Sequence, residues 1–216
     1  RTKVLFEAYH DLEQDIGSDT NDVKGNIEFR DVQFNYPDAT VPILEHLNIK
    51  IKAGTKVAIV GRTGSGKSTL VQLLPRLFEP TNGEVFLDGI PLKNYSKRSL
   101  RDSLGFVPQD HFLFSDTIEE NIGFGIKGAT TQDVEWAAEK AQVLDNILDF
   151  DKKFQTILGE KGITLSGGQK QRTAIARALI KKPKILILDD SLSAVDTKTE
   201  DAILKSLRND ETKVTV

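Results

Sequence analysis

The strongest structural signal in the sequence is residues 61–68, which read Gly61-Arg62-Thr63-Gly64-Ser65-Gly66-Lys67-Ser68. This segment matches G-x-x-x-x-G-K-[S/T], and it stands between the apolar run Lys56–Val60 and a predicted helix from Lys67 to about Phe78. Glycines let backbone N–H groups turn toward phosphate oxygens without a side-chain clash. We therefore predict a strand, a phosphate-binding loop and a helix. A glycine turn that only joins strand to helix is the alternative.

The polar residues of this loop have separate expected roles. The Lys67 ammonium would reach the β- and γ-phosphates of a nucleotide, and the Ser68 hydroxyl would ligate Mg²⁺. The expected nucleotide contacts are Gly61, Thr63, Gly64, Ser65, Gly66, Lys67, Ser68 and Thr69. A nucleotide with Mg²⁺ is the ligand that this chemistry predicts.

A carboxylate follows a second apolar run, Ile185–Leu188. A buried parallel strand would place Asp189 at the carboxyl edge of the sheet, where open α/β sheets bind ligands. Asp189 could there hold the metal's water shell beside Ser68.

Composition narrows the protein class. The chain has 216 residues, enough for one domain with a lobe, and it has no cysteine, which excludes disulfides, thiolate zinc sites and cysteine nucleophiles. The net charge of -3 argues against nucleic acid as a partner. No apolar run approaches the roughly 20 residues that cross a bilayer. The sequence begins at Arg1 and holds no methionine, so we expect a piece of a longer protein.

The pattern along the chain predicts an α/β protein. Residues Arg1–Gly25 hold a weakly helical stretch near Leu5–Leu12 and then an acidic connector. A strand with a bulge at Arg30-Asp31 follows. Further predicted strands are Pro42–Ile51, Lys56–Val60, Glu84–Leu87, Ile185–Leu188 and one from Lys213; predicted helices are Thr117–Ile122, Thr130–Ala141, Val143–Phe150, Gly168–Ile180 and Lys198–Leu207. The middle helices form a lobe inserted into the α/β body.

A second glycine segment, Leu165-Ser166-Gly167-Gly168-Gln169, opens the helix before the strand at Ile185. One nucleotide has no evident use for two such loops from one chain, which suggests a second copy. The phosphate loop at 61–68 and the segment Leu165–Gln169, which reads LSGGQ, together resemble the nucleotide-binding domain of an ATP-binding cassette (ABC) transporter. The resemblance covers nearly the whole chain from Asn26 onward. The resemblance implies a P-loop NTPase core with a mostly parallel sheet, an antiparallel β subdomain and an inserted helical subdomain at about residues 110–168, within a domain spanning 26–216.

The resemblance also implies roles for single residues. Tyr36, 25 residues before Gly61, is similar to the aromatic that stacks on adenine, with a core or turn aromatic as the alternative. Gln109 is similar to the glutamine that touches Mg²⁺ and senses the membrane domain. The signature residues Ser166, Gly167, Gly168 and Gln169 would close over ATP held by a second nucleotide-binding domain. Ser193–Asp196 resembles the loop that crosses the dimer seam.

Further partners and a location follow from the same resemblance. Gly159-Glu160-Lys161-Gly162 resembles the segment that exporters place against transmembrane domains. The chain would then lie at the cytoplasmic face of a membrane, with Arg1–Gly25 as the tether from those domains. The transported substrate is not encoded in this stretch.

The resemblance implies that Asp190, together with Lys67, serves catalysis, but Asp190 departs from the family pattern, which usually has Glu at that place to polarise the attacking water. Its carboxylate is one methylene short, and a reacting group misplaced by about 1 Å can cost on the order of 10²-fold in rate. An intact LSGGQ beside a shortened base resembles one half of an asymmetric pair, and a working Asp190 is the alternative. The histidine that contacts the γ-phosphate in the family would lie beyond Val216, and none of His10, His46 or His111 stands at its place.

Three other functions were weighed. A P-loop GTPase would need N-K-x-D, which the chain lacks, although Asp102-Ser103-Leu104-Gly105 fits D-x-x-G. A cassette for DNA repair, chromosome organisation or translation would carry a coiled-coil insertion, zinc ligands or a basic linker. A regulatory module that binds nucleotide without turnover follows if Asp190 is inert.

Overall fold

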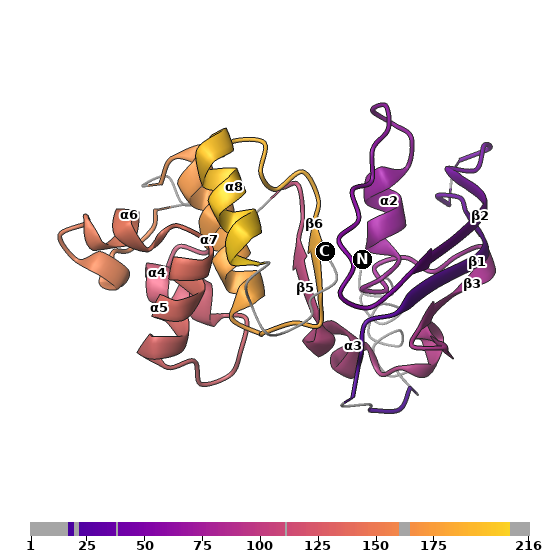
Figure 1. Ribbon diagram of the computed structural model, residues 1–216, viewed down its shortest axis with the longest axis horizontal. Helices are drawn as coiled ribbons and strands as arrows, with labels where there is room; N and C mark the ends of the chain where they lie inside the picture. The colour runs from indigo at the N-terminus through magenta and orange to yellow at the C-terminus, as the bar shows by residue number, and fades with distance from the viewer. Residues whose placement is uncertain (1–16, 20–21, 38, 111, 160–164, 208–216) are drawn as a thin grey trace, which may run out of the picture. The chain divides into compact units, whose positions relative to one another are not determined.

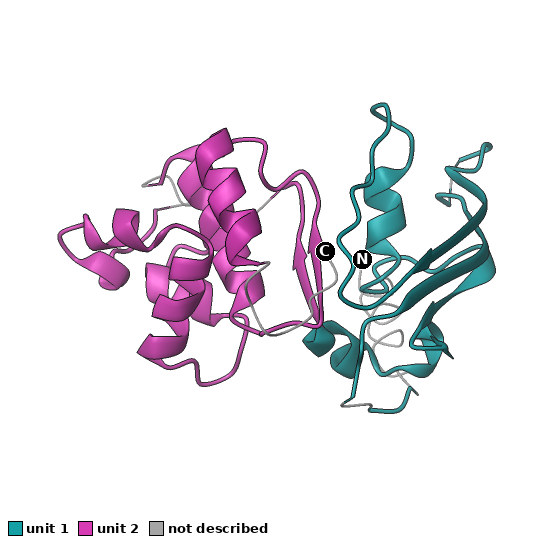
Figure 2. Cartoon of the chain, viewed as in Figure 1, with its two compact units in different colours: residues 1–103, 215 teal, residues 104–214, 216 magenta. Residues whose placement is uncertain are grey.

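The computed structural model describes residues 17–19, 22–37, 39–110, 112–159 and 165–207. These residues form two compact units: unit 1 holds the described residues up to Ser103, and unit 2 holds those from Leu104 onward (Figure 2). The predicted helix at 5–12, the strand from Lys213 and residues 160–162 of the exporter-like segment lie outside the described residues.

Unit 1 is built on a four-stranded antiparallel sheet in the order β2-β1-β3-β4 (Figure 1). Its strands are β1 Ile27–Phe34, β2 Leu44–Ile51, β3 Asn82–Leu87 and β4 Ile90–Pro91. The predicted bulge in β1 is confirmed, because the register with β2 shifts between Phe29 and Val32 and Asp31 has a φ of 48°. The shift keeps the apolar residues of β1 on one buried face.

The predicted strand at Lys56–Val60 is wrong in this structure. The segment adopts no strand, and all of its residues are exposed, Val60 at 88%. A strand exists only through hydrogen bonds to a neighbour, and the four strands of unit 1 pair among themselves. The apolar composition of this run therefore did not suffice to predict its pairing.

Helix α2 spans Lys67–Gln72 and is shorter than predicted. Proline at position 75 explains the early end, since it has no N–H for the Val71 carbonyl and disfavours helical backbone in the preceding residue. The chain continues in turns, with Leu74 N donating to Val71 O at 3.3 Å.

The remaining helices of unit 1 were not predicted. They are the short 3₁₀ helix η1 Leu92–Asn94 and α3 Lys97–Ser103. Helix α3 carries the basic cluster that begins at Lys97, and its Arg101 Nε donates to Pro75 O at 3.0 Å. Arg101 therefore stabilises the turn that follows α2.

Unit 2 contains the parallel pairing of the fold. Strand β5 Leu104–Val107 runs parallel to β6 Ile185–Leu188, with Leu104 opposite Ile185. The helices are α4 Ile118–Gly123, α5 Thr131–Lys140, α6 Leu144–Leu148, the 3₁₀ helix η2 Lys153–Gln155, α7 Gly167–Leu179 and α8 Thr197–Ser206. The five predicted helices of this region are confirmed within about two residues at each end, and β5 was missed.

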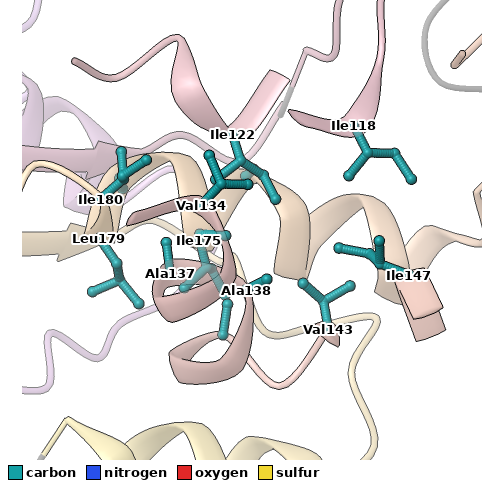
Figure 3. Packing of buried hydrophobic residues seen from close by; sticks show 14 of the residues in the cluster. Ile118, Ile122, Val134, Ala137, Ala138, Val143, Ile147, Ile175, Leu179 and Ile180 are labelled. Carbon is teal, nitrogen blue, oxygen red and sulfur yellow. The ribbon is translucent and has the colours of Figure 1, made fainter. Parts of the chain in front are cut away.

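A single apolar core holds unit 2 together. Helix α7 packs against α4, α5 and β5, and Figure 3 shows Ile175 among Val134, Ala137 and Ala138. The predicted cap of α5 is also confirmed: Asp133 N donates to Thr130 Oγ1, and the Asp133 carboxylate accepts from Thr130 N. The described residues thus form an α/β fold, with an antiparallel sheet in unit 1 and a parallel strand pair with a helical region in unit 2.

Candidate functional site

The phosphate loop of unit 1 depends on glycine at two positions. Gly64 and Gly66 have φ angles of 82° and 85°, which L-residues rarely adopt. A Cβ at Gly66 would lie 2.9 Å from Ile43 Cγ2, whereas a Cβ at Gly64 would have no described atom within 4 Å. Gly66 therefore permits close packing at the start of α2, and Gly64 leaves the loop open to a ligand.

Lys67 carries the positive charge of this loop. Its Nζ donates to Gly61 O at 2.8 Å and to Arg62 O at 2.9 Å. These bonds hold the ammonium against the loop backbone, on the same short segment as the exposed residues 61–65. A cation among backbone N–H groups is the donor set that phosphate oxygens require.

Tyr36 lies beside the loop's helix. Its hydroxyl is 3.0 Å from Thr69 Oγ1, and its ring packs edge-on against Phe34 and Phe78. The structure therefore brings Tyr36 to the residue that follows Ser68. Tyr36 is partly buried, and its adenine role stays a prediction.

In unit 2, the acidic pair follows β6. Asp189 N donates to Val107 O at 3.0 Å, so the pairing with β5 extends one residue past the strand. Asp190 then has a φ of 49°, and its Oδ2 lies 3.5 Å from Gln109 Nε2. Residues from two separate motifs, Gln109 and the pair Asp189-Asp190, thus lie together at the carboxyl ends of two parallel strands.

Ser191 fixes the turn that follows. Its side chain is buried, and its hydroxyl donates to Val107 O at 2.9 Å, with Asp189 O at 3.2 Å. The Asp190 backbone is therefore anchored from the next residue while its carboxylate remains exposed.

The signature residues form the N-terminus of α7. Ser166 is the N-cap: its Oγ accepts from Gln169 N at 3.3 Å, and its own N–H donates to Gln169 Oε1 at 2.9 Å. A Cβ at Gly168 would lie 2.8 Å from Ala194 O. The second glycine of the signature is thus required for contact with the turn after Asp190.

Two charged groups flank this turn. Burial lowers the pKa of Arg172, while the nearby Asp196 opposes that shift, and Arg172 Nε donates to Gly168 O at 3.2 Å. Asp196 caps α8, and hydrogen bonds from Thr199 lower the pKa of the Asp196 carboxyl. Asp196 therefore stays ionised near the signature helix.

The residues predicted to hold magnesium carry oxygen donors of the kind that nucleotide-bound Mg²⁺ uses. Within the described ranges, no three His, Asp or Glu side chains gather as a ready-made metal site. Nucleotide-bound Mg²⁺ usually takes only one or two protein oxygens and fills its shell with phosphate oxygens and water. Ser68, Gln109 and Asp189 offer hydroxyl, amide and carboxylate oxygens of this kind; Ser68 belongs to unit 1 and the other two to unit 2.

The buried polar residue Gln171 in α7 was not predicted from the sequence. The Gln171 side chain is 3% exposed and contacts the turn after Asp190. The signal was present, because Gln171 shares the buried face of the helix with Ala174 and Ile175, and a polar residue on an apolar face needs a partner.

A second buried network was not predicted either. Arg177 donates from Nε to Asn121 O at 2.7 Å and from an NH group to Asn121 Oδ1 at 2.8 Å. Burial lowers the pKa of Arg177 to about 10. Its guanidinium also lies 5.3 Å from the Phe114 ring centroid. The network joins α7 to α4.

None of the helices in the described part of the chain has the length and apolar character that a membrane crossing needs.

The family model described as ABC transporter matches residues 44–193. An uncharacterized ABC transporter ATP-binding protein from Bacillus subtilis is 44% identical over 90% of this chain and 34% of its own length. ATP-binding cassette sub-family B member 5 from Mus musculus is 49% identical over 86% of this chain, which covers 15% of that protein.

A solved structure agrees with the sequence relatives. A bacterial Atm1-family ABC exporter with ATP bound superposes with a TM-score of 0.85 at 39% identity, over 98% of this chain and 38% of the exporter. This chain thus spans about a third or less of the relatives it matches. The family match, the sequence identities and the shared fold together place it: the chain belongs to the ABC transporter family, as a nucleotide-binding domain of the exporter type.

Proposed function

We propose that this chain binds and hydrolyses ATP, and that it pairs with a second nucleotide-binding domain to drive export across a membrane. The observation that carries the proposal is the presence of two anion-suited glycine segments in one chain, the loop at 61–68 and the start of α7. One would hold the chain's own ATP, and the other would close over the partner's. The related Atm1-family exporter has ATP bound, which supports the choice of nucleotide.

The residues of unit 1 would bind the triphosphate. Lys67 would exchange its two bonds to the loop carbonyls for bonds to phosphate oxygens, and the loop N–H groups would add neutral donors. Ser68 would offer its hydroxyl to Mg²⁺, and Tyr36 would stack on adenine. Bound Mg²⁺ would neutralise charge that develops on the transferring phosphoryl group.

The residues of unit 2 would orient water and metal. Asp189 would hold the metal's water shell, and Gln109 would bring an amide oxygen to the same metal. Asp190 would accept a hydrogen bond from the attacking water and direct it in line with the leaving group. Its shorter side chain favours an asymmetric pair, in which this chain's ATP is retained and its signature residues complete the partner's working site.

The proposal extends to partners and location. The matched region covers only 35% of a putative multidrug export ATP-binding/permease protein from Staphylococcus aureus. That relative is therefore about three times as long as the region it shares with this chain. Transmembrane domains of the same transporter would therefore occupy other parts of the protein, and this chain would work at the cytoplasmic face. Nucleic acid is not an expected partner, given the net charge of -3.

The deciding experiment measures ATP turnover of the intact transporter with three changes. These are Asp190→Glu, Asp190→Ala and, separately, loss of the partner's catalytic carboxylate. The asymmetric hypothesis expects the partner change to abolish turnover and Asp190→Ala to leave most of it. The opposite pattern, with turnover lost on Asp190→Ala alone, contradicts the asymmetric pair. Binding of ATP without phosphate release in any variant supports a regulatory module instead.

A further inference from the structure

One buried side chain joins the start of α7 to the turn after Asp190. Gln171 lies one helical turn after Gly167 and Gly168 and is 3% exposed. Its Oε1 accepts from Ala194 N at 2.9 Å, and its Nε2 donates to Ser193 Oγ at 3.3 Å. A primary amide can donate and accept at once, and here both functions face the same short turn.

The connection continues to the acidic residue. Ser193 Oγ donates to Asp190 O at 3.0 Å. The donor chain therefore runs from Gln171 through Ser193 to the backbone of Asp190, whose φ of 49° needs support from its surroundings. A side chain on α7 thus helps to fix the backbone from which the Asp190 carboxylate projects.

Close packing makes this link stiff. The Gly168 backbone lies so near the turn that an added Cβ would be 2.8 Å from Ala194 O. Ser191 anchors the other side of the turn through its bond to Val107 O. A shift of the α7 N-terminus therefore has to move the turn with it, because few alternative positions exist for a buried, doubly bonded amide.

We propose that Gln171 is a positioning residue that couples the α7 N-terminus to Asp190, and thereby links the two ATP sites through one chain. The inference rests on the proposed function, in which Ser166 and Gly168 contact the partner's nucleotide while Asp190 serves the chain's own. Closure of the signature residues on one ATP is then transmitted through Gln171 to the residue that faces the other.

The test uses the intact transporter with Gln171→Met, Ser193→Ala and the double variant. Methionine keeps the length of glutamine but removes both hydrogen bonds. Gln132→Met, an exposed glutamine of α5, is the matched control. Turnover is measured against ATP concentration, with ATP affinity and thermal unfolding measured on the same samples.

We expect Gln171→Met to lower kcat about tenfold or more, because the unlinked α7 N-terminus no longer holds Ser166 and Gly168 in position over the ATP of the partner's working site. The KM for ATP should change by less than about twofold, since the phosphate loop is left intact. Ser193→Ala should have a smaller effect, and the double variant should be no slower than Gln171→Met alone, because both changes break one chain of bonds. Gln132→Met should behave as the wild type.

Other outcomes distinguish a failure of the proposed Gln171 role from a failure of the proposed ATPase function. An active wild type with an unchanged kcat in Gln171→Met overturns the inference alone. A loss of kcat that follows the loss of thermal stability, with multiplicative effects of the two substitutions, also overturns it. A wild-type transporter without ATP turnover overturns the proposed function and the inference together.

Discussion

The phosphate loop of unit 1 and the signature turn of unit 2 both place glycines at the start of a helix, but they are held differently. Residues 61–65 are exposed, and the bonds that hold the loop come from its own backbone and from Lys67. The signature turn, residues 165–169, is held by a local cap between Ser166 and Gln169 and by Gln171 in the same helix, which reaches Ala194, 23 residues away. A loop held by its own backbone is free to accept a ligand, whereas a turn bonded to a distant segment transmits movement.

The largest effect should come from the cation of the phosphate loop. Lys67→Met removes the ammonium, and we expect the affinity of the phosphate loop for ATP to fall by about 10–10²-fold, the loss that corresponds to about 1.5–3 kcal/mol for a hydrogen bond to a charged group. Thermal stability without nucleotide should change little, because Lys67 bonds loop carbonyls that water can satisfy. An ATP titration and a thermal melt on the intact transporter measure both. Lys127→Met, in an exposed loop, is the control, and equal ATP affinity in the two variants would contradict the assigned role.

A matched pair of substitutions tests the packing of the signature turn. A Cβ at Gly168 would meet Ala194 O at 2.8 Å, whereas a Cβ at Gly167 would meet Ala194 Cβ at an ordinary 3.7 Å. We expect Gly168→Ala to lower the free energy of unfolding by about 1–3 kcal/mol, as for overpacking. Gly167→Ala should be neutral or stabilising by up to about 1 kcal/mol, since alanine favours a helix. Urea unfolding measures the free energy of unfolding of both variants. Equal effects would mean that the backbone at Ala194 can move away from a Cβ at position 168 without cost.

The same difference explains what the sequence could predict. The phosphate loop follows from consecutive residues, because its conformation is set by glycine φ angles and by one lysine on the same segment. The helices of unit 2 follow from apolar periodicity and from caps such as Thr130 with Asp133. These are local properties, and the start of α2 at Lys67 and the helices of unit 2 are confirmed within about two residues.

Most of the features that were predicted wrongly or missed depend on distant partners, and one, the end of α2, has a local signal. The run at Lys56–Val60 has the composition of a strand, but pairing is decided by which neighbour is present. The end of α2 was overlooked although Pro75 signals it locally. The contacts of Gln171 with Ser193 cross 22 residues, and those of Arg177 with Asn121 cross 56, so no local pattern specifies them.

A third prediction concerns the cap that opens α7. Ser166→Ala removes the side-chain acceptor for Gln169 N, and we expect a loss of about 1 kcal/mol in the free energy of unfolding. Thr130→Ala removes the equivalent cap of α5 and should cost a similar amount. Only the Ser166 variant should also lower ATP turnover, because its hydroxyl is proposed to contact the partner's nucleotide. If both variants lose stability and neither loses turnover, Ser166 serves α7 alone.

The smallest effect tests whether a side-chain-bonded turn in unit 1 resembles the one in unit 2. Asp88 follows β3, and its carboxylate accepts backbone N–H bonds from Lys24, Gly25 and Asn26 at 2.7 to 3.1 Å. Partial burial raises the pKa of Asp88, but the hydrogen bonds, those from Asn26 foremost, outweigh it and hold the pKa below the ordinary value of 3.8. The folded state therefore favours the ionised carboxyl.

The sign of the pH dependence follows from that shift. A carboxyl with a lowered folded pKa stabilises the fold fully above its unfolded pKa, and this contribution is lost as pH falls below about 4. Asp88→Asn should therefore be less stable than the wild type at pH 7, and the difference should shrink as the pH falls from about 4. Urea unfolding at a series of pH values measures it, with Asp102→Asn on exposed α3 as the control. A difference that stays constant with pH would show that Asp88 acts through shape and not through charge, unlike the ionised cap Asp196 in unit 2.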